Sequence, residues 1–170
     1  MFRSAMMAVA LVSVAAQASA MELTSAQMKE GAMIAMPQVN SRCGGGNVSP
    51  QLSWSGAPAN TKGFALTVFD PDANKGKGFW HWAVYDIPAS TNSFALGKTP
   101  DNVQTAQNSF GDNNYDGPCP PPGSIHHYIF SLWALDTDSI LPSEPDAQSV
   151  LPELQKHVLA RAMLTPRYGR

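Results

Sequence analysis

A proline-rich segment at residues 117–123 places the strongest constraint on how this chain folds. Its sequence, Gly-Pro-Cys-Pro-Pro-Pro-Gly, contains four prolines, each of which holds φ at about −65° and removes a backbone donor. The glycines at its two ends allow tight turns. The segment leads into His126, His127 and Tyr128 at the start of an apolar stretch. We therefore expect a rigid loop that forms one wall of a pocket, with an ordinary connection between strands as the alternative.

The first twenty residues have the pattern of a secretory signal peptide. One positive charge, Arg3, precedes an apolar run at residues 8–16, and Ala-Ser-Ala at residues 18–20 supplies the small residues of a cleavage site. The run is too short to cross a bilayer, which argues against a membrane anchor. We therefore predict a signal peptide at residues 1–20, a single domain at residues 21–170, and a periplasmic or secreted protein.

Composition limits the classes of partner and fold. Removal of the predicted signal peptide leaves 10 basic and 13 acidic residues, a net charge too small to attract nucleic acid or an anionic membrane surface. A bound anion must therefore be held by a local site, and no stable membrane insertion is expected. The 14 prolines and 13 glycines indicate many turns and a loop-rich β structure.

The two cysteines, Cys43 and Cys119, would reach an oxidising compartment after secretion, which favours a disulfide between them. Chain-entropy arguments allow about 4 to 5 kcal/mol for closing so long a loop, and real values are often lower. Two free thiols are the alternative, because sequence does not show proximity. Two cysteines so far apart also lack the paired spacing of a zinc site, and we predict neither a metal nor a cofactor.

Three segments rich in aromatic and β-branched residues are typical of strands. Residues 64–69 end at an Asp-Pro pair, and residues 81–87 run to a proline. Residues 128–136 are nearly continuously apolar, as expected for a central strand that is covered on both faces. Residues 52–54 are expected to add a short strand.

Residues 149–163 have a different pattern, because their apolar side chains recur at helical spacing. We predict an amphipathic surface helix with Ser149 as its N-cap and Pro152 in its first turn. The Thr165-Pro166 pair is expected to end it. Strands followed by one terminal helix favour a mainly β sandwich with a C-terminal helix.

Polar motifs stand at the ends of the three main strands. Asp70 and Asp72 follow the first strand, His81 begins the second, and His126 and Tyr128 begin the third. These side chains meet at one sheet edge if the first strand runs antiparallel to the other two. Imidazole and phenol groups donate hydrogen bonds to phosphate-type oxygens, and we expect the carboxylates to orient the histidines and raise their pKa. The predicted site therefore binds a small anion, more tightly as the pH falls.

Some of these residues also have a structural explanation. Aspartates beside a proline, such as Asp70 and Asp72, commonly form turns. Adjacent strand residues point to opposite faces, and we expect His126 to face inward and His127 to face solvent. His157 follows Glu153 by four residues and is expected to pair with it on the surface.

Several longer motifs resemble the phosphatidylethanolamine-binding protein family, in its bacterial branch of Raf-kinase-inhibitor-like proteins. The similar stretches, in chain order, are residues 47–54, 70–73, 79–82, 108–111, 117–128 and 168–170. The resemblance implies a Greek-key β-sandwich with an anion pocket at one edge. It also implies binding without catalysis, an unidentified protein partner in a regulatory role, and a homodimer as one form of assembly. The implied ligand-binding residues are Asp70, Asp72, His81, His126 and Tyr128, with Gly117 and Pro118 on the rim.

Three residues depart from the pattern of that family. Asn74 stands where proline is common, which is expected to loosen the pocket wall. His127 replaces a more usual arginine and so removes a fixed charge and a planar fork. Pro166 replaces a common glycine, which leaves the path of the tail open. Weaker anion binding than in the relatives is expected near neutral pH.

Three functional hypotheses follow from the sequence. The leading one is a non-catalytic binding protein for a small phosphorylated or otherwise anionic ligand. The second is a metal-assisted hydrolase, which the absence of a helical His-x-x-x-His pair disfavours. The third is an interaction protein that inhibits or binds a partner through its surface, because one fold serves many functions.

Overall fold

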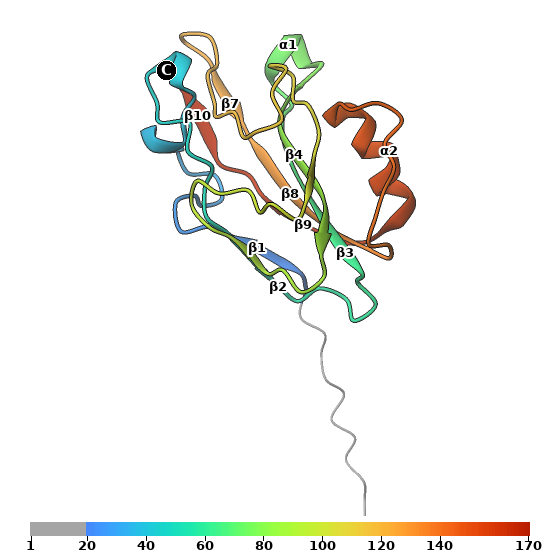
Figure 1. Cartoon of the computed structure of the whole chain (residues 1–170). Helices are drawn as coiled ribbons and strands as arrows, with labels where there is room; N and C mark the ends of the chain where they lie inside the picture. The colour runs from blue at the N-terminus through green and yellow to red at the C-terminus, as the bar shows by residue number, and fades with distance from the viewer. Residues whose placement is uncertain (1–19) are drawn as a thin grey trace, which may run out of the picture.

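The computed structural model describes residues 20–170 (Figure 1). Residues 1–19 of the predicted signal peptide lie outside the described residues. Within the described range, no helix has the length and apolarity needed to cross a membrane.

Three antiparallel sheets form the framework of the domain. The central sheet has five strands in the order β6 (Gln104–Thr105), β4 (Phe79–Pro88), β3 (Gly63–Asp70), β8 (Ile129–Leu135) and β9 (Val158–Leu164). A second sheet contains β1 (Glu22–Thr24), β2 (Leu52–Ser55) and β5 (Ser93–Phe94). The third pairs β10 (Arg167–Gly169) with β7 (Ile125–His127). The helical elements are η1 (Met36–Gln38), η2 (Ser41–Cys43), α1 (Ala73–Gly76) and α2 (Ala147–His157).

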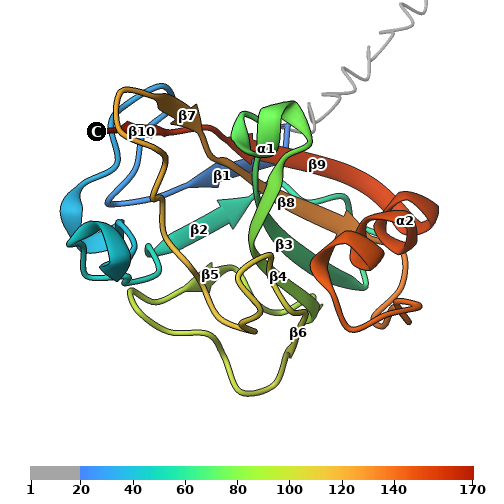
Figure 2. The ribbon, with the colours of Figure 1, turned by 90° about the horizontal axis from the view of Figure 1, so that it is seen from above.

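The main core lies between the central sheet and the β1–β2–β5 sheet, as the view from above shows (Figure 2). Alternate residues of β3, such as Leu66 and Val68, point into this core. From the smaller sheet, Trp54 packs edge-on against Phe64 and Phe94 at centroid distances of 5.8 and 5.5 Å. The predicted mainly β sandwich is therefore confirmed.

The opposite face of the central sheet is covered by α2 (Figure 1). Val150 and Leu154 of the helix are fully buried against Ala65, Ala83 and Trp133 of the sheet. Strands β3 and β8 are thus covered on both faces, which explains why their sequences are almost continuously apolar. The predicted central position of the strand at residues 128–136 is confirmed for β8, although a break at Tyr128 separates it from β7.

The connection between β4 and β8 is of the Greek-key kind. Strands β3 and β4 are consecutive neighbours, and the chain then passes through β5 in the other sheet and returns as β6 beside β4. After β7, strand β8 lies on the other side of β3. The C-terminal segment ends next to β7. Strand β10 pairs with β7 there and places Tyr168 opposite His126. Pro166 therefore does not divert the tail, and its carbonyl accepts a hydrogen bond from the amide of Tyr128.

The predicted C-terminal helix is shorter than its sequence pattern suggests. It ends at His157, and residues 158–164 form β9 against β8. The predicted N-cap is also wrong: Asp146 caps the helix by accepting from the amide of Ser149, and Pro152 lies beyond the first turn. The apolar residues of 158–164 fit a period of two as well as one of 3.6, and pairing with β8 decides between them.

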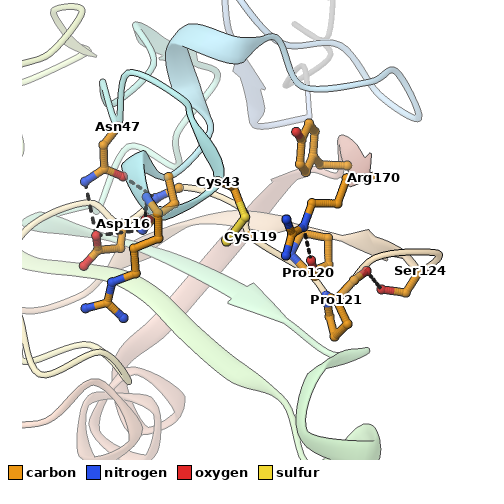
Figure 3. The surroundings of a disulfide bond; sticks show 12 residues. Cys43, Asn47, Asp116, Cys119, Pro120, Pro121, Ser124 and Arg170 are labelled. Atoms are coloured by element: carbon orange, nitrogen blue, oxygen red, sulfur yellow. Dashed lines mark hydrogen bonds between the residues drawn. A yellow bond between two sulfur atoms is a disulfide. The ribbon is translucent and has the colours of Figure 1, made fainter.

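A disulfide joins Cys43 to Cys119, with the Cα atoms 5.6 Å apart (Figure 3). It ties η2 to the proline-rich loop, as the sequence predicted. On the other side of the bond, Arg170 holds the same loop by donating from Nε to the carbonyl of Pro120 at 2.8 Å (Figure 3). The loop is therefore fixed from two directions.

Replacing both cysteines, Cys43→Ser with Cys119→Ser, should lower the free energy of unfolding by about 2 to 4 kcal/mol, because the unfolded chain regains the entropy of a long loop. Urea unfolding of the two proteins measures the difference. Equal unfolding midpoints and slopes would show that the bond adds no stability.

Candidate anion-binding site

The predicted polar motifs meet because β3 runs antiparallel to both β4 and β8. The end of β3, the start of β4 and the β7–β8 junction therefore lie at one edge of the sheet, next to α1 (Figure 1). A pocket of about 310 Å³ opens there. Its lining residues are Asp70, Asp72, Ala73, Asn74, Lys75, Phe79, His81, Phe110, Cys119, Pro120, Pro121, His126 and Tyr128.

Asp70 lies at the centre of this pocket with only 2 % of its surface exposed. One carboxylate oxygen accepts from the amides of Asp72 and Ala73 at 2.9 and 3.1 Å, which forms the turn after β3. The other oxygen accepts from Nδ1 of His126 at 2.7 Å and lies 4.0 Å from Nε2 of His81. Asp70 is thus both a turn former and the partner of a pocket histidine, and His126 faces inward as predicted.

His81 is buried and is held from the side opposite Asp70. Its Nδ1 lies 2.7 Å from the carbonyl oxygen of Asp116, and because a carbonyl only accepts, Nδ1 carries the proton. Burial lowers the pKa of His81 below its ordinary value and outweighs the opposing influences of the Asp116 carbonyl and the Asp70 charge. The predicted increase in histidine pKa is therefore wrong for His81, because desolvation of the charged ring dominates.

Tyr128 contributes a buried hydroxyl group that makes no well-formed hydrogen bond to the described part of the chain. The side chain is 1 % exposed, and its oxygen makes no hydrogen bond within residues 20–170. Burial, followed by the negative charge of Asp70, raises the pKa of Tyr128 well above its ordinary value. The phenol therefore stays protonated and remains a buried donor at the pocket wall, next to the Asp70 carboxylate.

Asp116 and three asparagines form a buried network behind His81. One carboxylate oxygen of Asp116 accepts from Asn40 and Asn47, each at 3.1 Å, and the other accepts from Asn108 at 2.9 Å. The backbone amide of Asp116 also donates to the carbonyl of His81. Sequence reasoning missed this support, and its only signal was that Asn47 and Asn108 belong to the motifs that resemble the family.

Asp72 lies on the rim of the pocket and pairs with His127. Its carboxylate accepts from the backbone amide of His127 at 2.8 Å and from Nδ1 of the same residue at 2.9 Å. Partial burial alone would raise the pKa of Asp72, but these hydrogen bonds outweigh it and the pKa is lowered. The exposed imidazole of His127 is thus directed to Asp72.

The turn that follows Asp72 depends on asparagine at position 74. Asn74 and Lys75 have φ values of 50° and 58°, in a region that asparagine tolerates and proline cannot adopt. The side chain of Asn74 also donates to the carbonyl of Gly78 at 3.0 Å. Asn74 therefore holds this turn of the pocket wall with its own hydrogen bond.

The proline-rich loop forms another wall, but not through all of its predicted residues. Cys119, Pro120 and Pro121 line the pocket, whereas Gly117 and Pro118 do not. The amide of Gly117 donates to Asn47, and a Cβ atom at that position would overlap the carbonyl oxygen of Gln38. Gly117 and Pro118 therefore support the loop from behind and do not face a ligand.

Aromatic side chains make up a part of the pocket that the sequence analysis missed. The rings of Phe79, Phe110 and Tyr128 surround His81 at centroid distances of 5.3, 5.8 and 5.1 Å. The guanidinium of Arg42 lies over the Phe110 ring at 4.9 Å. The only early indication was the position of Phe79 and Phe110 within the motifs that resemble the family.

Two further expectations concern groups outside the pocket. The predicted pair between His157 and Glu153 is wrong. His157 pairs with Asp136 at 2.9 Å, and Glu153 pairs with Lys156. Within residues 20–170, no group of three or more histidine, cysteine, aspartate or glutamate side chains has a geometry that could hold a metal ion.

Comparison of the sequence with known proteins identifies the family of this chain. A sequence model of the phosphatidylethanolamine-binding protein family matches residues 24–169. UPF0098 protein YbcL of Escherichia coli is 40 % identical over 171 residues, which cover 94 % of this chain and 93 % of that protein. UPF0098 protein YbhB of the same organism is 36 % identical and is covered completely. The chain therefore belongs to the phosphatidylethanolamine-binding protein family.

Solved structures agree with this assignment. The crystal structure of E. coli YbcL superposes with a TM-score of 0.85 at 39 % identity, covering 89 % of this chain and 99 % of that one. A phosphatidylethanolamine-binding protein from Plasmodium vivax superposes with a TM-score of 0.55 at 16 % identity, covering 88 % and 85 % of the two chains. The second likeness shows the fold alone.

The buried network predicts a large loss of stability for Asp116→Ala. Three asparagine amides lose their acceptor, so the free energy of unfolding should fall by about 2 to 4 kcal/mol. Asp138→Ala, at an exposed position, is the matched control and should change it by less than about 0.5 kcal/mol. Chemical denaturation of both variants measures the effect, and equal losses would contradict the structural role.

The lowered pKa of His81 predicts a loss of stability in acid. The unfolded chain binds a proton at this ring near pH 6.5, whereas the folded chain resists it, so stability falls as the pH drops below that value. His81→Asn keeps a donor toward Asp116 but cannot titrate. Wild-type protein should therefore lose more stability than the variant between neutral pH and pH 5, as measured by urea unfolding. Parallel pH profiles would show that His81 titrates normally.

Proposed function

We propose that this chain binds a small phosphate-type anion in the Asp70–His81–His126–Tyr128 pocket and releases it chemically unchanged, in a periplasmic or extracellular setting. The observation that carries the proposal is that His81, His126 and the buried hydroxyl of Tyr128 line one pocket, and this hydroxyl, which interacts with the Asp70 carboxylate, makes no well-formed hydrogen bond within the described residues. An anionic oxygen would accept from it and remove the cost of leaving it unpaired.

The histidines explain how the pocket would respond to an anion. Both rings direct Nδ1 to a fixed oxygen, so Nε2 is the nitrogen left to meet a ligand. A neutral Nε2 accepts a hydrogen bond, as from the P–OH group of hydrogen phosphate, whereas a protonated Nε2 donates to a bare oxygen. Anion binding is therefore expected to take up a proton at His81.

Two features of the pocket support a binding role, and a third supports the proposed compartment. The described lining residues include no serine or threonine, and Cys119, the one cysteine among them, is held in a disulfide. The phenol of Tyr128 resists ionisation because its pKa is raised. The disulfide itself supports an oxidising compartment.

Titration calorimetry with sulfate, phosphate, phosphoethanolamine and a nucleotide tests the proposal at about pH 5.5 and pH 8, on either side of the ordinary histidine pKa. Sulfate keeps the same charge at both values, so its affinity reports the protein alone and should rise about tenfold or more at the lower pH. No heat with any of the four compounds at either pH would contradict the proposal.

The variant Tyr128→Phe makes the test specific. Because the hydroxyl makes no well-formed hydrogen bond to the described residues of the protein, its removal should change the free energy of unfolding by less than about 1 kcal/mol, while sulfate affinity falls about tenfold. Tyr85→Phe, which removes a half-buried hydroxyl elsewhere, is the matched control and should bind normally. Unchanged sulfate affinity in Tyr128→Phe would remove the main support for the site.

A further inference from the structure

A second hollow, of about 210 Å³, lies on the other face of the central sheet beside α2. Phe69 and Trp80 line it, and these residues directly precede Asp70 and His81 of the first pocket. Successive strand residues point to opposite faces, so the two sites lie back to back across β3 and β4. This hollow has no part in the function proposed above.

The charged group of the hollow is Arg161 of β9. Its guanidinium lies 4.3 Å over the ring of Trp133, and one Nη donates to the hydroxyl of Ser131 at 2.7 Å. No carboxylate within residues 20–170 forms an ion pair with it. Partial burial lowers the pKa of Arg161, without an acidic neighbour to oppose the shift. Arg161 is thus a cation that is held in place, exposed to solvent and without a counter-charge among the described residues.

The remaining walls are largely apolar and flat. Phe69 and Trp80 pack with their ring centroids 4.6 Å apart, and Leu151 contributes from α2. The indole nitrogen of Trp133 already donates to Thr67 at 3.0 Å. Trp133 therefore offers contact area and no free donor. The polar contacts to a ligand would come from Arg161, Ser131 and Gln155.

We propose that this hollow binds a small carboxylic acid with a flat apolar body, its carboxylate on Arg161 and its body against Phe69 and Trp80. An apolar cavity of about 150 Å³ is large enough for benzene, so the space suits a single ring with one carboxylate. The planar guanidinium fork matches a carboxylate. A single cation favours a monoanion over a doubly charged phosphate.

The structural alternative is that Arg161 only shields Trp133 from water, and benzoate separates the two explanations. In ¹H–¹⁵N spectra, benzoate should shift the Nε1–H resonance of Trp133 with a dissociation constant on the order of 1 mM. Benzamide, which has the same shape without the charge, should bind at least about tenfold more weakly. No shift at about 20 mM benzoate, well above that constant, or equal binding of the two compounds, would overturn the proposal.

Variants confirm which site responds. Arg161→Gln should abolish the benzoate shift at Trp133, whereas Arg42→Gln, at the stacked arginine near the first pocket, should leave it unchanged. Tyr128→Phe should also leave it unchanged, so failure of the anion pocket and failure of this hollow are distinguishable. An undiminished shift in Arg161→Gln would refute the proposal, and the benzamide comparison decides the matter if that variant does not fold.

Discussion

The buried carboxylate of Asp70 is the interaction on which the pocket depends. It stands at the end of a core strand, accepts two amides of the turn that follows, and holds His126 on another strand. A buried carboxylate is tolerated only when its oxygens are satisfied by hydrogen bonds or opposite charge. The turn and the histidine supply these partners. The same contacts that make the charge tolerable therefore fix the shape of the site before a ligand arrives.

The two pocket histidines have different supports, and this difference sets their chemistry. His126 faces a carboxylate, whereas His81 donates to a backbone carbonyl and is enclosed by aromatic rings. Enclosure favours the neutral ring of His81 in the free protein. We therefore expect this ring to gain a proton only when a negative ligand binds beside it. Asp116 and the disulfide hold the surrounding walls from behind.

The fold and most of the pocket could be predicted from the sequence because strand ends and polar motifs coincide. The apolar runs located β3, β4 and β8, and antiparallel pairing brought Asp70, His81 and His126 together. The end of α2 could not be predicted, since residues 158–164 satisfy both the helix and the strand period.

Other features depend on tertiary burial, which single-sequence patterns do not contain. The direction of the His81 pKa shift was wrong because the nearby carboxylate is visible in sequence order but the enclosing rings are not. The Asp116 network brings Asn40 and Asn47, from a segment far away in the sequence, next to Asn108. The part that Asn74 plays in its turn could not be predicted, because its positive φ is known only from the backbone.

The protonation state of His81 tests the proposed anion pocket most directly. Nitrogen-15 spectra of histidine-labelled protein, recorded at about pH 7.5, well above the ordinary histidine pKa, distinguish the protonated from the unprotonated ring nitrogen with and without inorganic phosphate. The account predicts a neutral His81 with its proton on Nδ1 in the free protein, and a change at Nε2 when phosphate is added. A His81 that is already cationic in the free protein, or an Nε2 signal that phosphate leaves unaltered, would contradict it.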